Sequence, residues 1–335
     1  MMTIKEIEAA CDASQVLDFS RHELEIPELL LKRMFYPLGF PAEVRSNSAE
    51  VLELYEELWG MFEKQHDTEP ILVDVCVIEG GSVECPPAPE FHMTLPLLTN
   101  FADGNNYAIV DIEQNRTHVL ISRQTLRHKL YLGQCLLGAP WCCIATRYAT
   151  PVHAGCVSLN GRGILLCGDT GAGKSTLSYG CARAGWTYTS DDGSYVSHDR
   201  NDLLVTGTYY KVRFRPTAAE LFPEVRGQEI TPRVVGKPSI ELPTAPMEHI
   251  ECSQTAHVNF IVFLNRHSDG PPDLVPYRKD VARYSMRQVL YGSPETLAVQ
   301  YATIERLLTV DVLELRYTDL DWAVDRLQKL VQEGR

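Results

Sequence analysis

Eight residues in the second half of the chain have the types and spacing of a phosphate-binding loop. They run Gly168-Asp169-Thr170-Gly171-Ala172-Gly173-Lys174-Ser175 and fit the pattern Gly-x-x-x-x-Gly-Lys-Ser. The glycines let the backbone fold so that its N–H groups point at phosphate oxygens. Lys174 supplies a positive charge to the β- and γ-phosphates of a nucleotide, and the Ser175 hydroxyl can bind Mg²⁺. The pattern predicts that these residues, together with Thr176, bind ATP and Mg²⁺.

The residues around this loop predict the strand and the helix that such a site requires. Residues 164–167 form a short apolar run typical of a buried strand, and it leads directly into Gly168. A helix is predicted over residues 174–184 and ends at Gly185. Such a helix turns its positive end toward a bound anion. The alternative is a glycine-rich turn that matches the pattern by chance.

Two adjacent carboxylates, Asp191 and Asp192, follow the predicted strand 186–189 and begin 17 residues after Lys174. Side chains at the carboxyl ends of neighbouring strands meet where open α/β sheets bind ligands. Adjacent carboxylates are costly unless a cation or a shared proton relieves them. One aspartate can then bind Mg²⁺ while the other accepts a proton from an attacking hydroxyl. The alternative is a solvated turn, which Asp-Asp-Gly also favours.

Three cations follow in a predicted strand: Lys211, Arg213 and Arg215 alternate with Val212 and Phe214. Period two places the three cations on one face of the strand. This face suits a phosphate or an acidic substrate, and the two arginines can stabilise charge on a transferring phosphoryl group. The alternative is the solvated face of an edge strand, where cations are common.

Residues 216–246 come next and contain six prolines but little periodicity. They are predicted to form either a mobile lid over the nucleotide or a plain surface loop. In the first case three cations would reach the nucleotide, namely Arg226, Arg233 and Lys237.

The second half of the chain alternates strands and helices, which is typical of an α/β nucleotide-binding domain. Residues 156–159 and 163–167 predict a hairpin joined by the turn Asn160-Gly161. The apolar strand 258–264 is followed by Asn265 rather than an aspartate, which leaves Asp191 and Asp192 as the metal and base candidates. The other predicted elements are strands 203–206, 210–214 and 312–317, and helices 293–308 and 321–332, the last capped by Asp319.

The first half has a different texture and predicts an α+β module. Helices are predicted over residues 1–35, over 48–63 with Ser48 as the N-cap, and over 126–137. Strands are predicted over 71–78, 107–112 and 117–121. A chain of 335 residues favours two domains, with an N-terminal α+β domain at 1–150 and a nucleotide-binding domain at 151–335.

Composition excludes several classes of protein. The net charge is -13, which argues against a nucleic-acid binder. Residues 1–20 carry no apolar signal-peptide core, and no run approaches the roughly 20 apolar residues of a membrane span, so no membrane association is expected. The ten cysteines are irregularly spaced and predict small buried side chains in a reducing compartment. We therefore expect a soluble, cytoplasmic protein.

Three sequence pieces together resemble the catalytic domain of the HPr kinase/phosphorylase family. They are His153-Ala154-Gly155 ahead of the hairpin, the loop 168–175, and the strand 185–192 that ends in two aspartates. The resemblance covers roughly residues 150–335 and is strongest over 152–192. It implies an α/β P-loop domain of the HPr kinase/PEP carboxykinase-like type that phosphorylates a hydroxyl on a peptide, a protein or a small molecule. It also implies assembly into a homo-oligomer.

The resemblance also implies a role for each matching residue. Asp191 would be the general base that deprotonates the acceptor, and His153 would orient or tune it. Asp192 and Ser175 would hold Mg²⁺, while Lys174 would neutralise the transferring phosphoryl group. The chain departs from the family where Thr176 replaces an acidic residue and where Lys211 stands near an expected acidic metal ligand.

Three functions follow as hypotheses. The first is a kinase that moves the γ-phosphate of ATP to a hydroxyl, with the N-terminal domain recognising the acceptor or mediating assembly. The second is an ATP-binding regulatory or assembly protein that hydrolyses ATP slowly and makes no phosphorylated product. The third is a carboxykinase-like lyase, for which the sequence shows no second-metal set of Lys, His and Asp.

Overall fold

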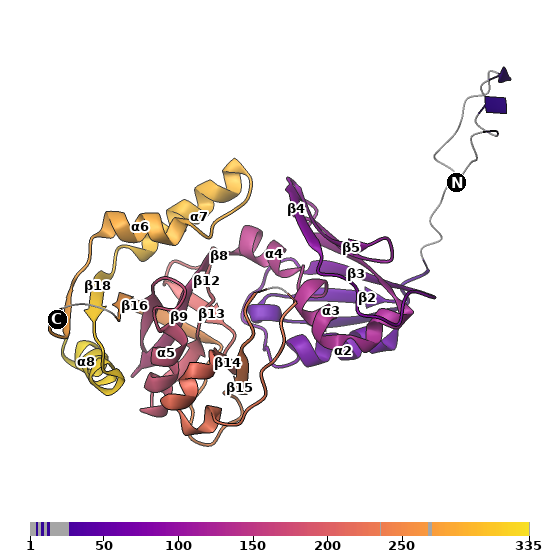
Figure 1. The fold of residues 1–335 in the computed structure, drawn as a ribbon. Coiled ribbons are helices and arrows are strands. Elements are labelled where there is room, and N and C mark those ends of the chain that lie inside the picture. Colours follow the sequence, from indigo (N-terminus) through magenta and orange to yellow (C-terminus); the bar gives the residue numbers. More distant parts are fainter. Residues whose placement is uncertain are drawn as a thin grey trace.

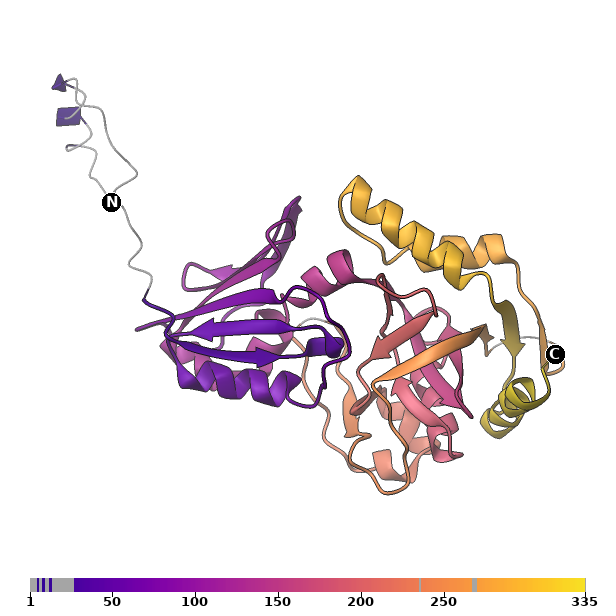
Figure 2. The same cartoon turned by 180° about the vertical axis from the view of Figure 1, so that it is seen from behind.

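The computed structural model describes residues 5, 8, 9, 12, 13, 27–234, 236–266 and 270–334. Within these ranges the strands form a seven-stranded sheet, a nine-stranded sheet and a two-stranded ribbon. Figures 1 and 2 show the two large sheets side by side, each with its own helices. The helices of the described part of the chain are all too short or too polar to cross a membrane.

The first sheet is a mixed sheet with the strand order β1-β2-β3-β7-β6-β5-β4. Strand β3 is parallel to both neighbours, and Ile71, Val73, Val75 and Val77, which share one face of it, are all buried. Helix α2 buries Val51, Tyr55 and Trp59, which recur at helical spacing on one face. The elements are β1 (Leu31–Phe35), β2 (Ala42–Ser46), α2 (Ala49–Trp59), β3 (Ile71–Ile78), β4 (Glu90–Thr94), β5 (Leu97–Asp103), β6 (Asn106–Asp111), β7 (Arg116–Ser122), α3 (Lys129–Cys135) and α4 (Trp141–Cys143).

Two expectations for this half need correction. The helix expected over 1–35 is wrong at its end, because β1 pairs antiparallel with β2 there. The chain reverses between these strands at Leu38 and Gly39, whose φ angles are +53° and +88°. Most of residues 1–26 lie outside the described residues. The helix expected over 48–63 begins after Ser48 but ends at Trp59, and the Ser48 side chain makes no capping bond.

The second sheet is built around the long strand β16, which runs parallel to β10 and β18 over its second half and antiparallel to β13 at its start. The expected hairpin is confirmed: β9 and β10 pair through a turn in which Asn160 and Gly161 both have positive φ. The strands are β8 (Ala149–Val152), β9 (Ala154–Leu159), β10 (Arg162–Cys167), β11 (Thr187–Ser190), β12 (Ser194–Ser197), β13 (Leu204–Gly207), β16 (Thr255–Asn265), β17 (Asp273–Pro276) and β18 (Asp311–Arg316).

Helices cover both faces of this sheet. Along β10, Ile164 and Leu166 pack into one core with α5 and α8, whereas Leu165 and Cys167 pack into a second core with α6 and α7. The helices are α5 (Lys174–Arg183), α6 (Lys279–Arg287), α7 (Pro294–Leu307) and α8 (Leu320–Glu333). The predicted cap is confirmed, since the Asp319 side chain accepts a hydrogen bond from the backbone of Trp322.

The ribbon pairs β14 (Lys211–Phe214) with β15 (Ile240–Pro243) and lies between α5 and the first sheet (Figure 1). Its apolar residues Val212 and Phe214 join the core around α5. The two halves of the chain also contact directly, because the Gln254 amide bonds both the backbone N–H (2.9 Å) and the carbonyl (3.0 Å) of Glu63.

Candidate active site

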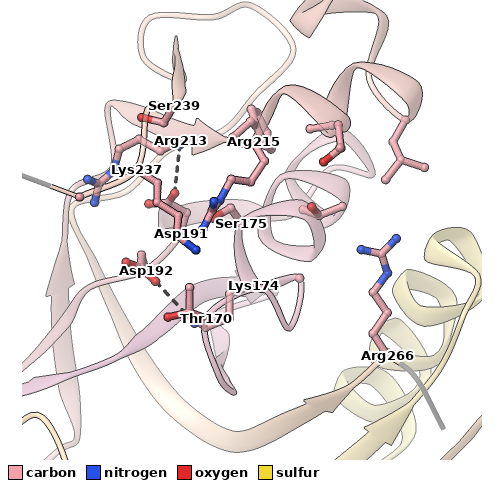
Figure 3. Close-up of a pocket in the computed structure, with 18 of the residues that line it drawn as sticks. Thr170, Lys174, Ser175, Asp191, Asp192, Arg213, Arg215, Lys237, Ser239 and Arg266 are labelled. Carbon is pink, nitrogen blue, oxygen red and sulfur yellow. Dashed lines mark hydrogen bonds and ion pairs between the residues drawn. The ribbon is translucent and has the colours of Figure 1, made fainter. Parts of the chain in front are cut away.

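A cavity of about 580 Å³ lies where the loop after β10, the end of β11 and the ribbon converge (Figure 3). The predicted residues that line it are His153, Thr170, Gly171, Gly173, Lys174, Ser175, Thr176, Asp191, Asp192, Arg213 and Arg215. Of the other predicted loop residues, Gly168 and Asp169 line a neighbouring cavity, and Ala172 lines neither.

The glycine loop, residues 168–173, joins β10 to the first turn of α5. Gly168, Gly171 and Gly173 have φ angles of +146°, +94° and +101°, a region that favours glycine. The backbone N–H groups of Gly171, Gly173, Lys174 and Ser175 donate to no acceptor within the described part of the chain. Unpaired donors at the N-terminus of a ten-residue helix form a site that favours an anion.

Lys174 is the first residue of α5 and is only 5% exposed. Its ammonium donates to the carbonyls of Gly168 at 3.0 Å and Asp169 at 3.3 Å. The same Nζ lies 3.5 Å from Oδ1 of Asp192. The lysine charge is therefore held at the mouth of the loop, where it can meet a phosphate.

Asp192 lies at the centre of a short chain of polar contacts. Its Oδ1 is 2.9 Å from Nε2 of His153, and this contact, with the nearby charges of Lys174 and Arg213, lowers the pKa of Asp192 to about 2. The expectation that His153 orients Asp191 is therefore wrong. The hairpin places His153 just before β9, opposite the second aspartate rather than the first.

Asp191 is buried and has different partners. Its Oδ2 accepts a hydrogen bond of 3.0 Å from the backbone N–H of Arg213, and Ser175 lines the same cavity. Burial raises the pKa of Asp191, although the backbone N–H and the charge of Arg213 oppose the shift. Burial disfavours the Asp191 carboxylate as an anion unless a cation neutralises it, so the site favours a bound cation such as Mg²⁺.

The donor set fits a magnesium ion that completes its shell with water and phosphate oxygens. We expected Ser175 and Asp192 to be the ligands. Asp191 lines the same cavity, and one oxygen of Asp192 is engaged by His153 and Lys174. The described residues contain no cluster of three or more His, Cys, Asp or Glu side chains that could hold a metal by themselves. Mg²⁺ commonly binds through one or two carboxylates plus substrate phosphates, so this set is sufficient.

Cations form the opposite side of the cavity. Arg213, Arg215, Arg233 and Lys237 line it, and we call these four residues the cationic wall. Among the described residues, Arg213, Arg215 and Lys237 have no ion-pair partner, which leaves them free to meet an anion, whereas Arg233 pairs with Glu241.

Two of the other predicted cations lie outside the cavity lining. Lys211 forms an ion pair of 3.0 Å with Glu241, and Arg226 donates to the carbonyl of Ala219.

Several lining residues were missed by reasoning from the sequence: Thr217, Glu220, Ser239 and Arg266. Arg266 directly follows β16, whose neighbour β10 leads into the glycine loop. Carboxyl ends of adjacent parallel strands meet at one edge, so the residue after Asn265 could have been predicted. The Asn265 side-chain amide donates a hydrogen bond of 2.8 Å to the Glu314 carboxylate, and nothing in this contact indicates that Asn265 binds a metal.

Comparisons with known proteins find a structural likeness but no sequence match. No family model matches the chain, and no curated protein matches it. Among solved structures, the HPr(Ser) kinase/phosphatase from Coxiella burnetii aligns over 55% of this chain and 99% of its own, with 13% sequence identity and a TM-score of 0.29. Likeness at this level identifies neither an activity nor a substrate in this chain.

Proposed function

We propose that this protein is an ATP-dependent kinase that transfers the γ-phosphoryl group to a hydroxyl on an acceptor. In this proposal residues 151–335 are an HPr-kinase-like P-loop catalytic domain, and residues 1–150 recognise the acceptor or mediate assembly. The observation that carries the proposal is the contact chain from Lys174 through Asp192 to His153 at the mouth of the glycine loop. It brings together a phosphate-binding cation and a carboxylate that can accept a proton.

In this proposal the glycine loop binds the phosphates of the nucleotide. Its unpaired N–H groups and the end of α5 bind phosphate oxygens, and Lys174 moves from the loop carbonyls to the β- and γ-phosphates. When bound between Ser175 and Asp191, Mg²⁺ would neutralise charge on the phosphates. Arg213 and Arg215 then stabilise the charge that spreads over the transferring group.

The proton acceptor in this proposal is Asp192 rather than Asp191. The low pKa of Asp192 keeps it ionised at neutral pH, and its hydrogen bond fixes it toward His153. As the new bond forms between phosphorus and the acceptor oxygen, the bond to the β-phosphate oxygen breaks and the hydroxyl proton passes to Asp192. A weak base suffices because phosphoryl transfer depends mainly on positioning and electrostatics.

A specific observation supports the alternative of a nucleotide-dependent regulator. The cavity offers only Asp191, Asp192 and Glu220 as acids among the described residues, and an ion pair with Glu241 occupies Lys211, near the site of the expected third metal ligand. Such a site could hydrolyse ATP slowly without an acceptor. Phosphate release that does not depend on any added acceptor would favour this function.

The experiment that tests the proposal supplies γ-labelled ATP and Mg²⁺ together with an extract of the source cells. Wild type is compared with Lys174→Ala, Asp192→Asn and, as a surface control, Lys329→Ala. We expect a labelled product from wild type and from the control, and none from the other two variants. Label that appears only as free phosphate, at one rate with and without extract, would replace the kinase proposal with the regulator.

A further inference from the structure

A second cavity of about 110 Å³ lies against the glycine loop and contacts the candidate site at one residue. His153 lines both cavities, and Gly168 and Asp169, whose carbonyls hold the Lys174 ammonium, line the smaller one. Helix α6 and the residues after it close the other side with Met286 and Val289. His153, one end of the contact chain with Asp192 and Lys174, therefore lies at the junction of the two cavities.

We infer that this smaller cavity, which we call the acceptor port, admits the hydroxyl-bearing arm of the acceptor. The inference rests on the proposed function. In-line transfer requires the attacking oxygen and the leaving oxygen to lie on opposite sides of the phosphorus atom. The nucleotide occupies the large cavity along the loop and the cationic wall, so the acceptor approaches from the other side of the junction. Its hydroxyl passes His153 to reach Asp192 in the large cavity.

Size and lining define the chemistry of the acceptor. A water molecule takes about 30 Å³ of liquid, so the port has room for roughly three or four waters, or for a hydroxyalkyl arm such as that of serine or threonine. Val152, Phe263, Met286 and Val289 supply apolar contacts to the carbon atoms of such an arm. The remainder of the acceptor stays outside the port.

The entrance lies at the end of α6. Ser285, Gln288 and Val289 line the port and are also exposed, so an arm can enter from solvent without passing the nucleotide. The same arm could belong to a free small alcohol or to a side chain of a polypeptide, because both present the same hydroxyalkyl chemistry. Exposed Tyr284 and Val281 on the same helix give either one an apolar surface beside the entrance.

The test blocks the entrance with a large side chain. Val289→Trp and Ser285→Trp are compared with wild type and with Val299→Trp, an exposed valine on α7 that lines neither cavity. Each protein receives γ-labelled ATP with either the small-molecule filtrate or the retained proteins of a source-cell extract. Binding of a fluorescent ATP analogue is measured in parallel, and its retention shows that each variant is folded.

We expect both blocked variants to lose roughly a hundredfold of labelled product because a misplaced acceptor is costly, while their affinity for the nucleotide analogue stays at the wild-type value. The fraction that becomes labelled identifies the source of the arm. Wild-type labelling by both variants would overturn the port and leave the kinase proposal standing. If wild type itself labels nothing in either fraction, the proposed function fails and the port fails with it.

Discussion

The two sides of the candidate site are built in different ways. The glycine loop is one continuous segment between strand β10 and helix α5. Its shape follows from glycines at positive φ. The cationic wall is assembled from Arg213 on β14, Arg215 directly after it, Arg233 and Lys237, all of which are distant in sequence from the loop. One side is local, whereas the other depends on contacts across the molecule.

Contacts with the N-terminal half support the cationic wall. Just before β14, the hydroxyls of Tyr209 and Tyr210 donate to backbone carbonyls at the end of α2, at Met61 and Leu58. The Gln134 amide on α3 bonds the backbone on either side of Arg233. It donates to the Pro232 carbonyl at 3.3 Å and accepts from the Val234 N–H at 3.1 Å.

Because of these contacts, substitutions in the two parts of the molecule should have different effects. Changes in the loop should remove the chemistry itself, whereas changes in the N-terminal half should shift the cations and weaken binding while leaving the loop intact. The predictions that follow test this separation from the largest expected effect to the smallest.

Loss of the loop lysine should have the largest effect. In Lys174→Ala the phosphoryl group loses a buried cation, and we expect turnover to fall by roughly 10²–10³, as when one preorganised electrostatic contact is removed. Steady-state ATP turnover at saturating nucleotide measures this, with Lys329→Ala on the exposed face of α8 as the matched control. If Lys174→Ala kept a third of wild-type turnover, the glycine loop would not be the part of the site on which phosphoryl transfer depends.

Asp191→Asn should lower activity and raise stability at neutral pH. Because burial raises the pKa of Asp191 above its ordinary value of 3.8, the ionised side chain destabilises the folded state at pH 7. Asparagine removes that charge and can still accept the hydrogen bond from Arg213, while Mg²⁺ loses its carboxylate ligand. We expect roughly 10²-fold lower Mg²⁺-dependent turnover from the lost metal assistance.

The pH dependence checks the sign of this effect. As the pH falls, Asp191 of the folded wild type becomes protonated and the destabilisation by its buried charge disappears. The stability advantage of Asp191→Asn should therefore shrink and vanish below about pH 3.8. Urea unfolding of both proteins between pH 7 and pH 3.5 measures it. An Asp191→Asn protein that is less stable than wild type at pH 7 would contradict the account of a buried, disfavoured carboxylate.

The local side of the site was largely predictable from sequence. The strand before the loop, the helix that begins at Lys174 and the aspartates after β11 were all expected, and the structure has them. Each depends on short-range rules, namely an apolar run, a glycine at positive φ and a helix N-terminus. The choice between the aspartates was not predictable, because the register of β9 against β11 decides which carboxylate faces His153.

The long-range side was only partly predictable. The alternation over residues 211–215 predicted that Arg213 and Arg215 share a face, and both line the cavity, but it did not predict that Lys211 pairs with Glu241 from β15. Under the lid alternative Arg226, Arg233 and Lys237 would reach the nucleotide; Arg233 and Lys237 line the cavity, whereas Arg226 does not. Nothing local distinguishes these three cations, because the backbone bonds of Gln134, about 100 residues earlier in the sequence, hold the chain on both sides of Arg233.

Gln134→Ala should weaken nucleotide binding without changing the chemical step. Each lost hydrogen bond contributes about 0.5–1.5 kcal/mol, so we expect the KM for ATP to rise about three- to tenfold as Arg233 loses its fixed position, with kcat nearly unchanged. Gln332→Ala, at the exposed end of α8, is the matched control. If kcat falls as far as in Lys174→Ala while KM is constant, the two sides of the site are not separable.

Tyr209→Phe should have the smallest effect and should act on stability alone. It removes one hydrogen bond, from the Tyr209 hydroxyl to the Met61 carbonyl, while the ring can keep its edge contact with Phe62. We expect a loss of about 1 kcal/mol in the free energy of unfolding, measured in urea. Tyr284→Phe on the exposed face of α6 should lose less, because its hydroxyl bonds no described residue. The KM for ATP should stay within about twofold, since Gln134 still holds the backbone beside Arg233. A larger rise in KM would mean that the start of β14, rather than the Gln134 contact, sets the position of the cationic wall.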